Sequence, residues 1–160
     1  LGKIILIEPE ALLTKASKIP GLDGQKMSKS YENMISLRDE PKVITQKIKK
    51  MPTDPARIKL SDPGDPNKCP VWQMHQVYSP QDTLDWVVEG CTKAKIGCIE
   101  CKGPVIDSVI SELGPIQERI AKYQSNPNLI QEIIFDGSER ARSVAKNTLE
   151  EVRDAMGITY

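Results

Sequence analysis

The sequence predicts the end of an α/β domain followed by an all-helical domain. Residues 4–7 (Ile-Ile-Leu-Ile) form a continuous apolar run, which is typical of a buried parallel strand. Beyond residue 39, apolar residues recur mainly at helical spacing, and proline or capping residues precede the segments. The chain of 160 residues contains no internal repeat, and its length allows one domain plus part of another. We expect domains over residues 1–38 and 39–160.

The first domain is expected to end in a mobile loop. A buried strand at the very start suggests that the chain begins partway through a larger α/β unit. Residues 20–25 (Pro-Gly-Leu-Asp-Gly-Gln) carry the residues that favour turns. The following residues 26–30 (Lys-Met-Ser-Lys-Ser) are therefore expected on a glycine-flanked loop.

The second domain is expected to begin with a helix. Asp39 is a favourable N-cap residue, and Pro41 is tolerated in the first turn of a helix that reaches about Lys50. Residues 52–67 are rich in Pro, Gly and Asp and show no periodicity, which predicts an ordered loop.

Further helices are predicted toward the C-terminus. Ser79, followed by proline, opens one helix, and apolar residues at helical spacing continue through residues 105–120. Asn126, again followed by proline, caps the next helix, and Gly137 is expected to interrupt or end it. Residues 141–156 predict a closing amphipathic helix.

Composition narrows the classes of function. The net charge is zero, so no global field favours nucleic acid, although local basic faces are not excluded. No apolar run approaches the roughly 20 residues needed to span a bilayer, and the N-terminus lacks the layout of a signal peptide. We therefore expect a cytoplasmic protein without a membrane partner, whose cysteines are ligands or free thiols rather than disulfides.

The loop carries two ammonium groups, on Lys26 and Lys29, which are three residues apart. Such a pair can close over a polyphosphate and neutralise the charge that builds up on transferring and leaving oxygens. Ser28 and Ser30 add hydrogen-bond donors, and Met27 can anchor the loop on an apolar surface. The alternative is a solvated surface loop that happens to be basic.

All four cysteines of the chain fall in one window, with 21, six and two residues between them: Cys69, Cys91, Cys98 and Cys101. Four thiolates suit a tetrahedral zinc ion or an iron–sulfur cluster. Zinc ribbons generally bring two Cys-x₂-Cys pairs, whereas this chain has one. A [4Fe–4S] cluster tolerates irregular gaps, and four unrelated buried thiols are the third alternative.

The loop and the segment after it resemble a known family. Residues 20–33 (PGLDGQKMSKSYEN) resemble the second ATP signature of class I aminoacyl-tRNA synthetases, and within that class they are most similar to bacterial tryptophanyl-tRNA synthetases. Residues 53–57 (TDPAR), 62–66 (DPGDP) and 69–71 (CPV) resemble the same family. The resemblance extends over essentially the whole chain and corresponds to the C-terminal half of the enzyme.

This resemblance implies roles for the loop residues. Lys26 and Lys29 would be catalytic and would contact the phosphates of ATP, bound with Mg, while Ser28 and Ser30 would act as supporting donors. Glu32 departs from the glycine that is common at its position in the family. The resemblance also implies a remnant of a Rossmann-like catalytic domain over residues 1–38 and a helical anticodon-binding domain over residues 39–160.

The resemblance favours iron over zinc. Some tryptophanyl-tRNA synthetases carry a [4Fe–4S] cluster, and the cysteine spacing of this chain differs from theirs by one residue in the first gap. The cluster would hold a loop and two helices so that the helical domain presents a fixed surface to the anticodon of tRNA(Trp). His75, the only histidine, is expected to be a packed or surface helix residue without a chemical role.

The family's first ATP signature and its tryptophan pocket have no counterpart in this sequence. The chain alone is therefore expected to be inactive and to require the N-terminal half of the enzyme, which uses ATP and L-tryptophan. Family members are homodimers, and their dimer contacts lie largely before residue 1. The alternative function is a non-catalytic tRNA-binding module, or one that responds to metal or redox state.

Overall fold

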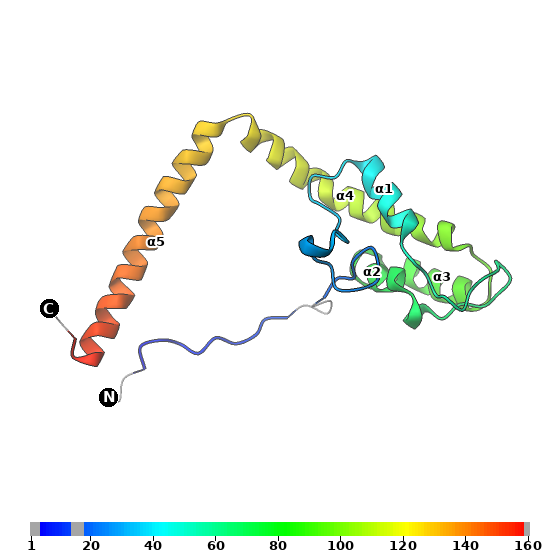
Figure 1. Ribbon diagram of the computed structural model, residues 1–160, viewed down its shortest axis with the longest axis horizontal. Helices are drawn as coiled ribbons and strands as arrows, with labels where there is room; N and C mark the ends of the chain where they lie inside the picture. The colour runs from blue at the N-terminus through cyan, green and yellow to red at the C-terminus, as the bar shows by residue number, and fades with distance from the viewer. Residues whose placement is uncertain (1–3, 14–17, 159–160) are drawn as a thin grey trace. The chain divides into compact units, whose positions relative to one another are not determined.

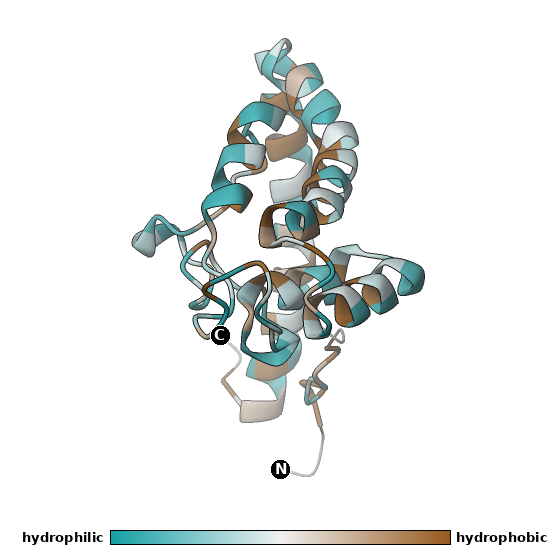
Figure 2. Ribbon diagram, turned by 90° about the vertical axis from the view of Figure 1, so that its right-hand side faces the viewer, coloured by the Kyte–Doolittle hydropathy of each residue, from teal (hydrophilic) through white to brown (hydrophobic). Residues whose placement is uncertain are grey.

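The computed structural model describes residues 4–13 and 18–158, and within these ranges its regular elements are helices (Figure 1). The elements, including two short 3₁₀ helices (η), are η1 (Lys29–Tyr31), α1 (Pro41–Lys50), η2 (Pro66–Lys68), α2 (Pro70–Tyr78), α3 (Gln81–Thr92), α4 (Cys98–Gln124) and α5 (Pro127–Met156). Figure 2 shows brown and teal segments alternating along the helices, as amphipathic helices require. Among the described residues, no helix combines the length and apolar character that crossing a membrane requires.

The strand predicted at residues 4–7 is wrong. These residues have no regular structure, and the side chains of Ile4 and Ile7 are 87% and 90% exposed. A parallel strand exists only when a neighbouring strand supplies its hydrogen-bond partners. In the described part of the chain, the only β-type pairing is an isolated antiparallel bridge between Pro20 and Lys26. The Rossmann-like remnant is therefore not seen, whereas the helical character of the rest is confirmed.

The chain divides into two units, which we describe separately. Residues 13–118 form one unit, and residues 1–12 with 119–160 form the other, apart from the positions that are not described. In the first unit, residues of α1, α2 and α4 and the residue after α1 meet in one buried core. Its members are Ile44, Ile48, Met51, Val71, Met74, Val105, Ile106, Val109 and Leu113. Burying each of these side chains contributes about 1.5–3 kcal/mol, so this core holds the unit together.

A buried lysine joins α4 to the end of α1. The Lys102 side chain is 3% exposed, and its ammonium group donates to the carbonyl oxygens of Lys49 (2.8 Å) and Met51 (2.6 Å). Carbonyl groups at a helix C-terminus lack partners inside the helix, and a cation also complements the helix dipole there. Lys102 thus fixes the helix that begins at Cys98 against the end of α1.

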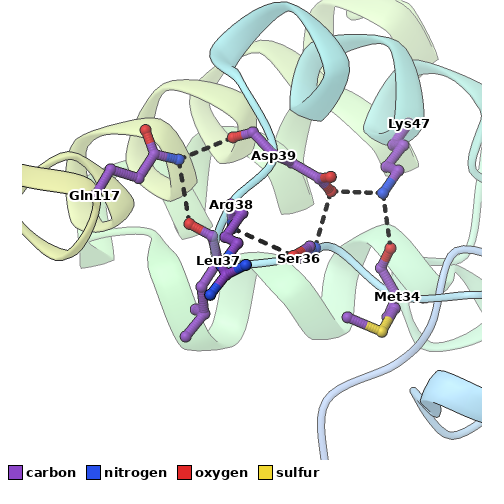
Figure 3. A network of polar contacts seen from close by, with 7 residues as sticks. All are labelled: Met34, Ser36, Leu37, Arg38, Asp39, Lys47 and Gln117. Atoms are coloured by element: carbon purple, nitrogen blue, oxygen red, sulfur yellow. Dashed lines mark hydrogen bonds and ion pairs between the residues drawn. The ribbon is translucent and has the colours of Figure 1, made fainter. Parts of the chain in front are cut away.

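The helix predicted to end near Lys50 is confirmed, but its N-cap is Glu40 and not Asp39. The carboxylate of Asp39 instead forms an ion pair with Lys47, whose ammonium group also donates to the carbonyl oxygen of Met34 at 3.1 Å (Figure 3). Gln117 of α4 donates to the carbonyl oxygen of Asp39 at 2.8 Å. The segment that leads out of the Lys-Met-Ser-Lys-Ser loop is therefore attached to both α1 and α4.

In the second unit, α5 begins as predicted and continues further than predicted. Asn126 caps it by accepting a hydrogen bond from the amide of Leu129 at 3.2 Å. The expected break at Gly137 is wrong, because α5 runs without interruption to Met156. An interior glycine costs about 1 kcal/mol relative to alanine, and the helix-favouring residues around it outweigh this cost. Gly157, with φ of +69°, ends the helix in the left-handed conformation that glycine favours.

Candidate functional site

The Lys-Met-Ser-Lys-Ser loop is closed by short-range hydrogen bonds. The amide of Gly21 donates to the carbonyl oxygen of Gln25 at 2.6 Å, and the amide of Met27 donates to that of Ile19 at 3.2 Å. Gly24 has φ of +82°, a conformation that glycine adopts without steric cost. The expected turn at residues 20–25 is thus present and delivers the chain to Lys26.

The two lysines of the loop face outward. The side chains of both Lys26 and Lys29 are exposed, and η1 begins at Lys29. The hydroxyl of Ser28 accepts a hydrogen bond from the amide of Ser30 at 3.3 Å and so caps this 3₁₀ turn. Because the side chains of both lysines are exposed, both cations are available to an anionic ligand.

Met27, by contrast, points toward the helices. Its side chain helps to line an apolar cavity of about 240 Å³. The other lining residues are Ile19, Ile35, Leu37, Met74, Tyr78, Val109, Glu112, Leu113 and Ile116. Met27 thus faces the same cavity as residues of α2 and α4, which is where an apolar anchor for the loop would lie.

Glu32 ends the 3₁₀ turn in a left-handed conformation, with φ of +53°. Residues other than glycine adopt this conformation at a cost of about 1–2 kcal/mol. We predict that Glu32→Gly raises the free energy of unfolding by about 0.5–1 kcal/mol, after subtraction of the greater entropy of an unfolded glycine. Urea titration measures the change. The matched control is Glu118→Gly in the exposed face of α4, which should lower stability by about 1 kcal/mol. A loss of stability in both variants would contradict the left-handed turn.

The four cysteines come together around one small cavity of about 20 Å³, and each is half-buried. Cys69 immediately precedes α2, Cys91 lies in α3, and Cys98 and Cys101 lie in the first turn of α4. Thr53, Asp54, Arg57 and Val71 complete the lining. Residues that are far apart in the sequence are thus gathered at one place in the first unit.

The 52–67 loop lies close against the cysteine cavity and contacts it through Arg57 and Gly64. The Arg57 guanidinium donates to the carbonyl oxygen of Ile96 at 2.6 Å, and its Nη1 lies 3.9 Å from Sγ of Cys91. Gly64 donates its amide to the carbonyl oxygen of Cys91 at 3.0 Å. A Cβ atom on Gly64 would lie 2.6 Å from Sγ of Cys91, so only glycine allows the loop to pass this close.

His75 packs beside the cavity, as expected for a structural histidine. It is fully buried, with Nε2 donating to the carbonyl oxygen of Cys101 at 3.0 Å and Nδ1 lying 2.8 Å from Oγ of Ser79. Burial lowers the pKa of His75, and the bond to the Cys101 carbonyl partly offsets this effect. The ring is therefore a neutral bridge between α2 and α4.

The four thiol groups could supply thiolate ligands to a metal, but their arrangement in the structure is not that of a metal site. Burial, followed by the influence of the other three cysteines, raises the pKa of Cys101 to about 12. Cysteines that share a cavity are held as thiolates when a metal cation coordinates them. Across residues 4–13 and 18–158, however, no group of three or more His, Cys, Asp or Glu side chains is arranged to hold a metal ion.

Sequence reasoning gave no role to two groups that organise these regions. Asn33 occupies the inside of the loop with a side chain that is 4% exposed, and the Arg57 guanidinium braces the cysteine cavity. An asparagine that follows a turn-rich segment within a few residues is a local signal that could have identified the first, although its burial is visible only in the structure. No local signal identifies the second, because its partner Ile96 is 39 residues away.

Comparisons with known proteins agree on one family. Residues 1–114 match the family model described as tRNA synthetases class I (W and Y). The chain is 57% identical over 158 residues to a tryptophan–tRNA ligase of Ralstonia nicotianae, covering 99% of this chain and 40% of the relative. It is 46% identical over 154 residues to a tryptophan–tRNA ligase of Thermotoga maritima, covering 96% and 47%. The chain thus spans less than half the length of these relatives and matches their C-terminal part.

Solved structures give the same answer for the fold. The crystal structure of tryptophanyl-tRNA synthetase from Campylobacter jejuni, complexed with ADP and tryptophan, superimposes with a TM-score of 0.74 at 24% identity. It covers 96% of this chain and 48% of that one, and at this identity the likeness concerns the fold alone. The tryptophanyl-tRNA synthetase of Aeropyrum pernix gives a TM-score of 0.58 at 30% identity, over 67% of this chain and 31% of that one.

Proposed function

The chain belongs to the class I tRNA synthetases (W and Y), and from this we propose that it is the C-terminal part of a tryptophan–tRNA ligase. The complete enzyme would convert tryptophan, ATP and tRNA(Trp) into tryptophanyl-tRNA, AMP and pyrophosphate. The names of the relatives support tryptophan over tyrosine, because those described above are tryptophan–tRNA ligases.

The observation that carries this proposal is the ordered loop with two exposed lysines. Lys26 and Lys29 emerge from a turn whose backbone is hydrogen-bonded, while Met27 lines a cavity together with residues of α2 and α4. In the complete enzyme the two ammonium groups contact the phosphates of ATP, next to its Mg ion, and stabilise the charge on departing pyrophosphate. Ser28 and Ser30 donate to the same phosphates. Residues 1–38 belong with the catalytic domain under this proposal.

Residues 39–160 form the part that recognises the anticodon of tRNA(Trp). The helical elements and the family membership support this assignment. The part of the enzyme that precedes residue 1 supplies the tryptophan pocket and the first ATP signature. Adenylate formation therefore needs both halves, whereas anticodon binding rests on residues 39–160 alone.

Cys69, Cys91, Cys98 and Cys101 are the ligands of a [4Fe–4S] cluster in this proposal, with zinc as the alternative. The support is the gathering of four thiols around one small cavity. A cuboidal cluster spaces its thiolate ligands more widely than one zinc ion does. When bound, the cluster would serve as a structural clip, and the cysteines would then join α2, α3 and the start of α4.

A chimera tests the proposed function directly. The preceding part of the Ralstonia relative is joined to this chain, which replaces the segment that is 57% identical to it. We expect the chimera to charge tRNA(Trp) with tryptophan, and not tRNA(Tyr) with tyrosine. Aminoacylation with labelled amino acids measures both reactions.

Two further measurements keep the result interpretable. Circular dichroism shows whether the chimera is folded, and binding of tRNA(Trp) to this chain alone measures the anticodon module separately. A folded chimera that charges neither tRNA would overturn the catalytic role of the chain. A chimera that charges tRNA(Tyr) with tyrosine would overturn the choice of tryptophan.

A further inference from the structure

The side chain of Asn33 lies inside the loop and uses both ends of its amide. Its Nδ2 donates to Oδ1 of Asp23 at 2.8 Å and to the carbonyl oxygen of Lys26 at 3.2 Å. Its Oδ1 accepts a hydrogen bond from the amide of Ser28 at 2.8 Å. The last two contacts flank Met27, so one buried amide fixes the backbone on both sides of this residue, which is the first of the two that separate the lysines.

The surrounding chain is built to admit this side chain. The amide of Leu22 donates to the carbonyl oxygen of Asn33 at 2.7 Å. A Cβ atom on Gly21 would lie 2.3 Å from Nδ2 of Asn33, so glycine is required for this approach. Asp23 also accepts from the amide of Gln25 at 2.9 Å, and the bond from Asn33 is the largest of the effects that hold the pKa of Asp23 below its usual value. Asn33 and Asp23 thus form a linked pair at the centre of the loop.

Only an amide of this length meets both demands. An aspartate at position 33 could still accept from Ser28, but it has no donor for Lys26 and would bring a second carboxylate against Asp23. An alanine would leave all three partners without the bonds that Asn33 makes. A buried polar group that loses its hydrogen-bond partner costs free energy. The loop would therefore change its conformation and would not preserve the space left by the Asn33 side chain.

We propose that Asn33 is a positioning residue that holds Lys26 and Lys29 in the arrangement needed to stabilise departing pyrophosphate. This inference rests on the proposed function and extends it to a residue outside the Lys-Met-Ser-Lys-Ser sequence. Asn33 acts through the backbone of residues 26–28, and its loss displaces the lysines without removing their charge. Displacement of a catalytic group by about 1 Å can cost about 10²-fold in rate.

The first test uses this chain alone and does not depend on activity. Amide hydrogen exchange at Ser28 is measured for the wild type and for Asn33→Ala, with Asn147→Ala on the exposed face of α5 as the matched control. We expect exchange at Ser28 to become about tenfold faster in Asn33→Ala, as loss of one ordinary hydrogen bond implies. Asn33→Asp should keep the protection, because its carboxylate still accepts from Ser28. Unchanged exchange in Asn33→Ala would overturn the inference.

The second test uses pyrophosphate exchange in the chimera. We expect Asn33→Ala to lower kcat by about 10²-fold, with the KM for tryptophan and the melting temperature almost unchanged. Asn33→Asp should be similarly slow, and adding Asp23→Asn should recover only part of the rate, since the pair regains its own hydrogen bond while the carbonyl oxygen of Lys26 still lacks a donor. A general structural role would instead lower the melting temperature and raise the KM together, and that result would overturn the inference.

The two tests separate this inference from the proposed function. If the unsubstituted chimera is inactive, the proposed function fails, and the exchange at Ser28 still decides whether Asn33 orders the loop. If the chimera is active and Asn33→Ala is equally active, the proposed function stands and the positioning role is wrong.

Discussion

In protein that carries the proposed cluster, Cys98→Ser is expected to weaken the binding of iron and to lower the free energy of unfolding by about 3 kcal/mol. Structural metal sites contribute about 10–16 kcal/mol in zinc-finger peptides, and losing one of four ligands forfeits roughly a quarter of the lower figure. Cys98 is the first residue of α4 and shares its cavity with cysteines beside α2 and in α3. Iron and sulfide analysis with a visible spectrum, on anaerobically purified protein, measures the first effect. Urea unfolding and protease resistance measure the second.

The matched control is the same substitution in protein stripped of metal. A serine hydroxyl is close in size to a thiol, so Cys98→Ser should change the stability of the stripped protein by less than about 1 kcal/mol. About four irons and four sulfides for each wild-type chain, as a [4Fe–4S] cluster requires, would support the cluster. One zinc and no colour would support the zinc alternative. If the protein contains neither metal, and the wild type and Cys98→Ser unfold alike, the four cysteines are unrelated thiols.

The parts of the fold that depend on neighbours in the sequence could be predicted. Asn126 caps α5 through a bond to a residue three positions away, and Pro41 begins α1 as its fixed φ angle allows. The turn before Lys26 is likewise closed within a few residues. Each of these structures is decided by local chemistry, which one sequence contains in full.

The parts that depend on distant partners could not be predicted. Lys102 reaches carbonyl oxygens of α1 from 53 residues away, and Arg57 reaches Ile96 across 39 residues. The apolar run at residues 4–7 has the pattern of a strand, but a strand is stable only beside another strand. The gathering of the cysteines was expected from their clustering in the sequence. That they line one small cavity together with Thr53, Asp54, Arg57 and Val71 is visible only in three dimensions.

Lys29→Ala in the chimera is expected to slow tryptophanyl-adenylate formation by about 10²–10³-fold. Removal of one preorganised donor from a developing anionic centre commonly costs this much. The Lys29 side chain is exposed and emerges from a capped turn, so the substitution removes a cation without opening the core. Pyrophosphate exchange measures the rate of the chemical step, and a filter-binding titration with tRNA(Trp) measures affinity for the anticodon module.

The separation of these two readouts decides the assignment. Lys29 lies in the loop, whereas the buried core is built mainly from α1, α2 and α4. The affinity of Lys29→Ala for tRNA should therefore hardly change. Lys42→Ala, at an exposed position of α1, is the matched control and should leave exchange at the wild-type rate. If Lys29→Ala and Lys42→Ala slow pyrophosphate exchange equally, the effect reflects only a general dependence on positive charge. Equal loss of exchange and tRNA affinity in Lys29→Ala would show that the loop and the anticodon module do not have separate roles.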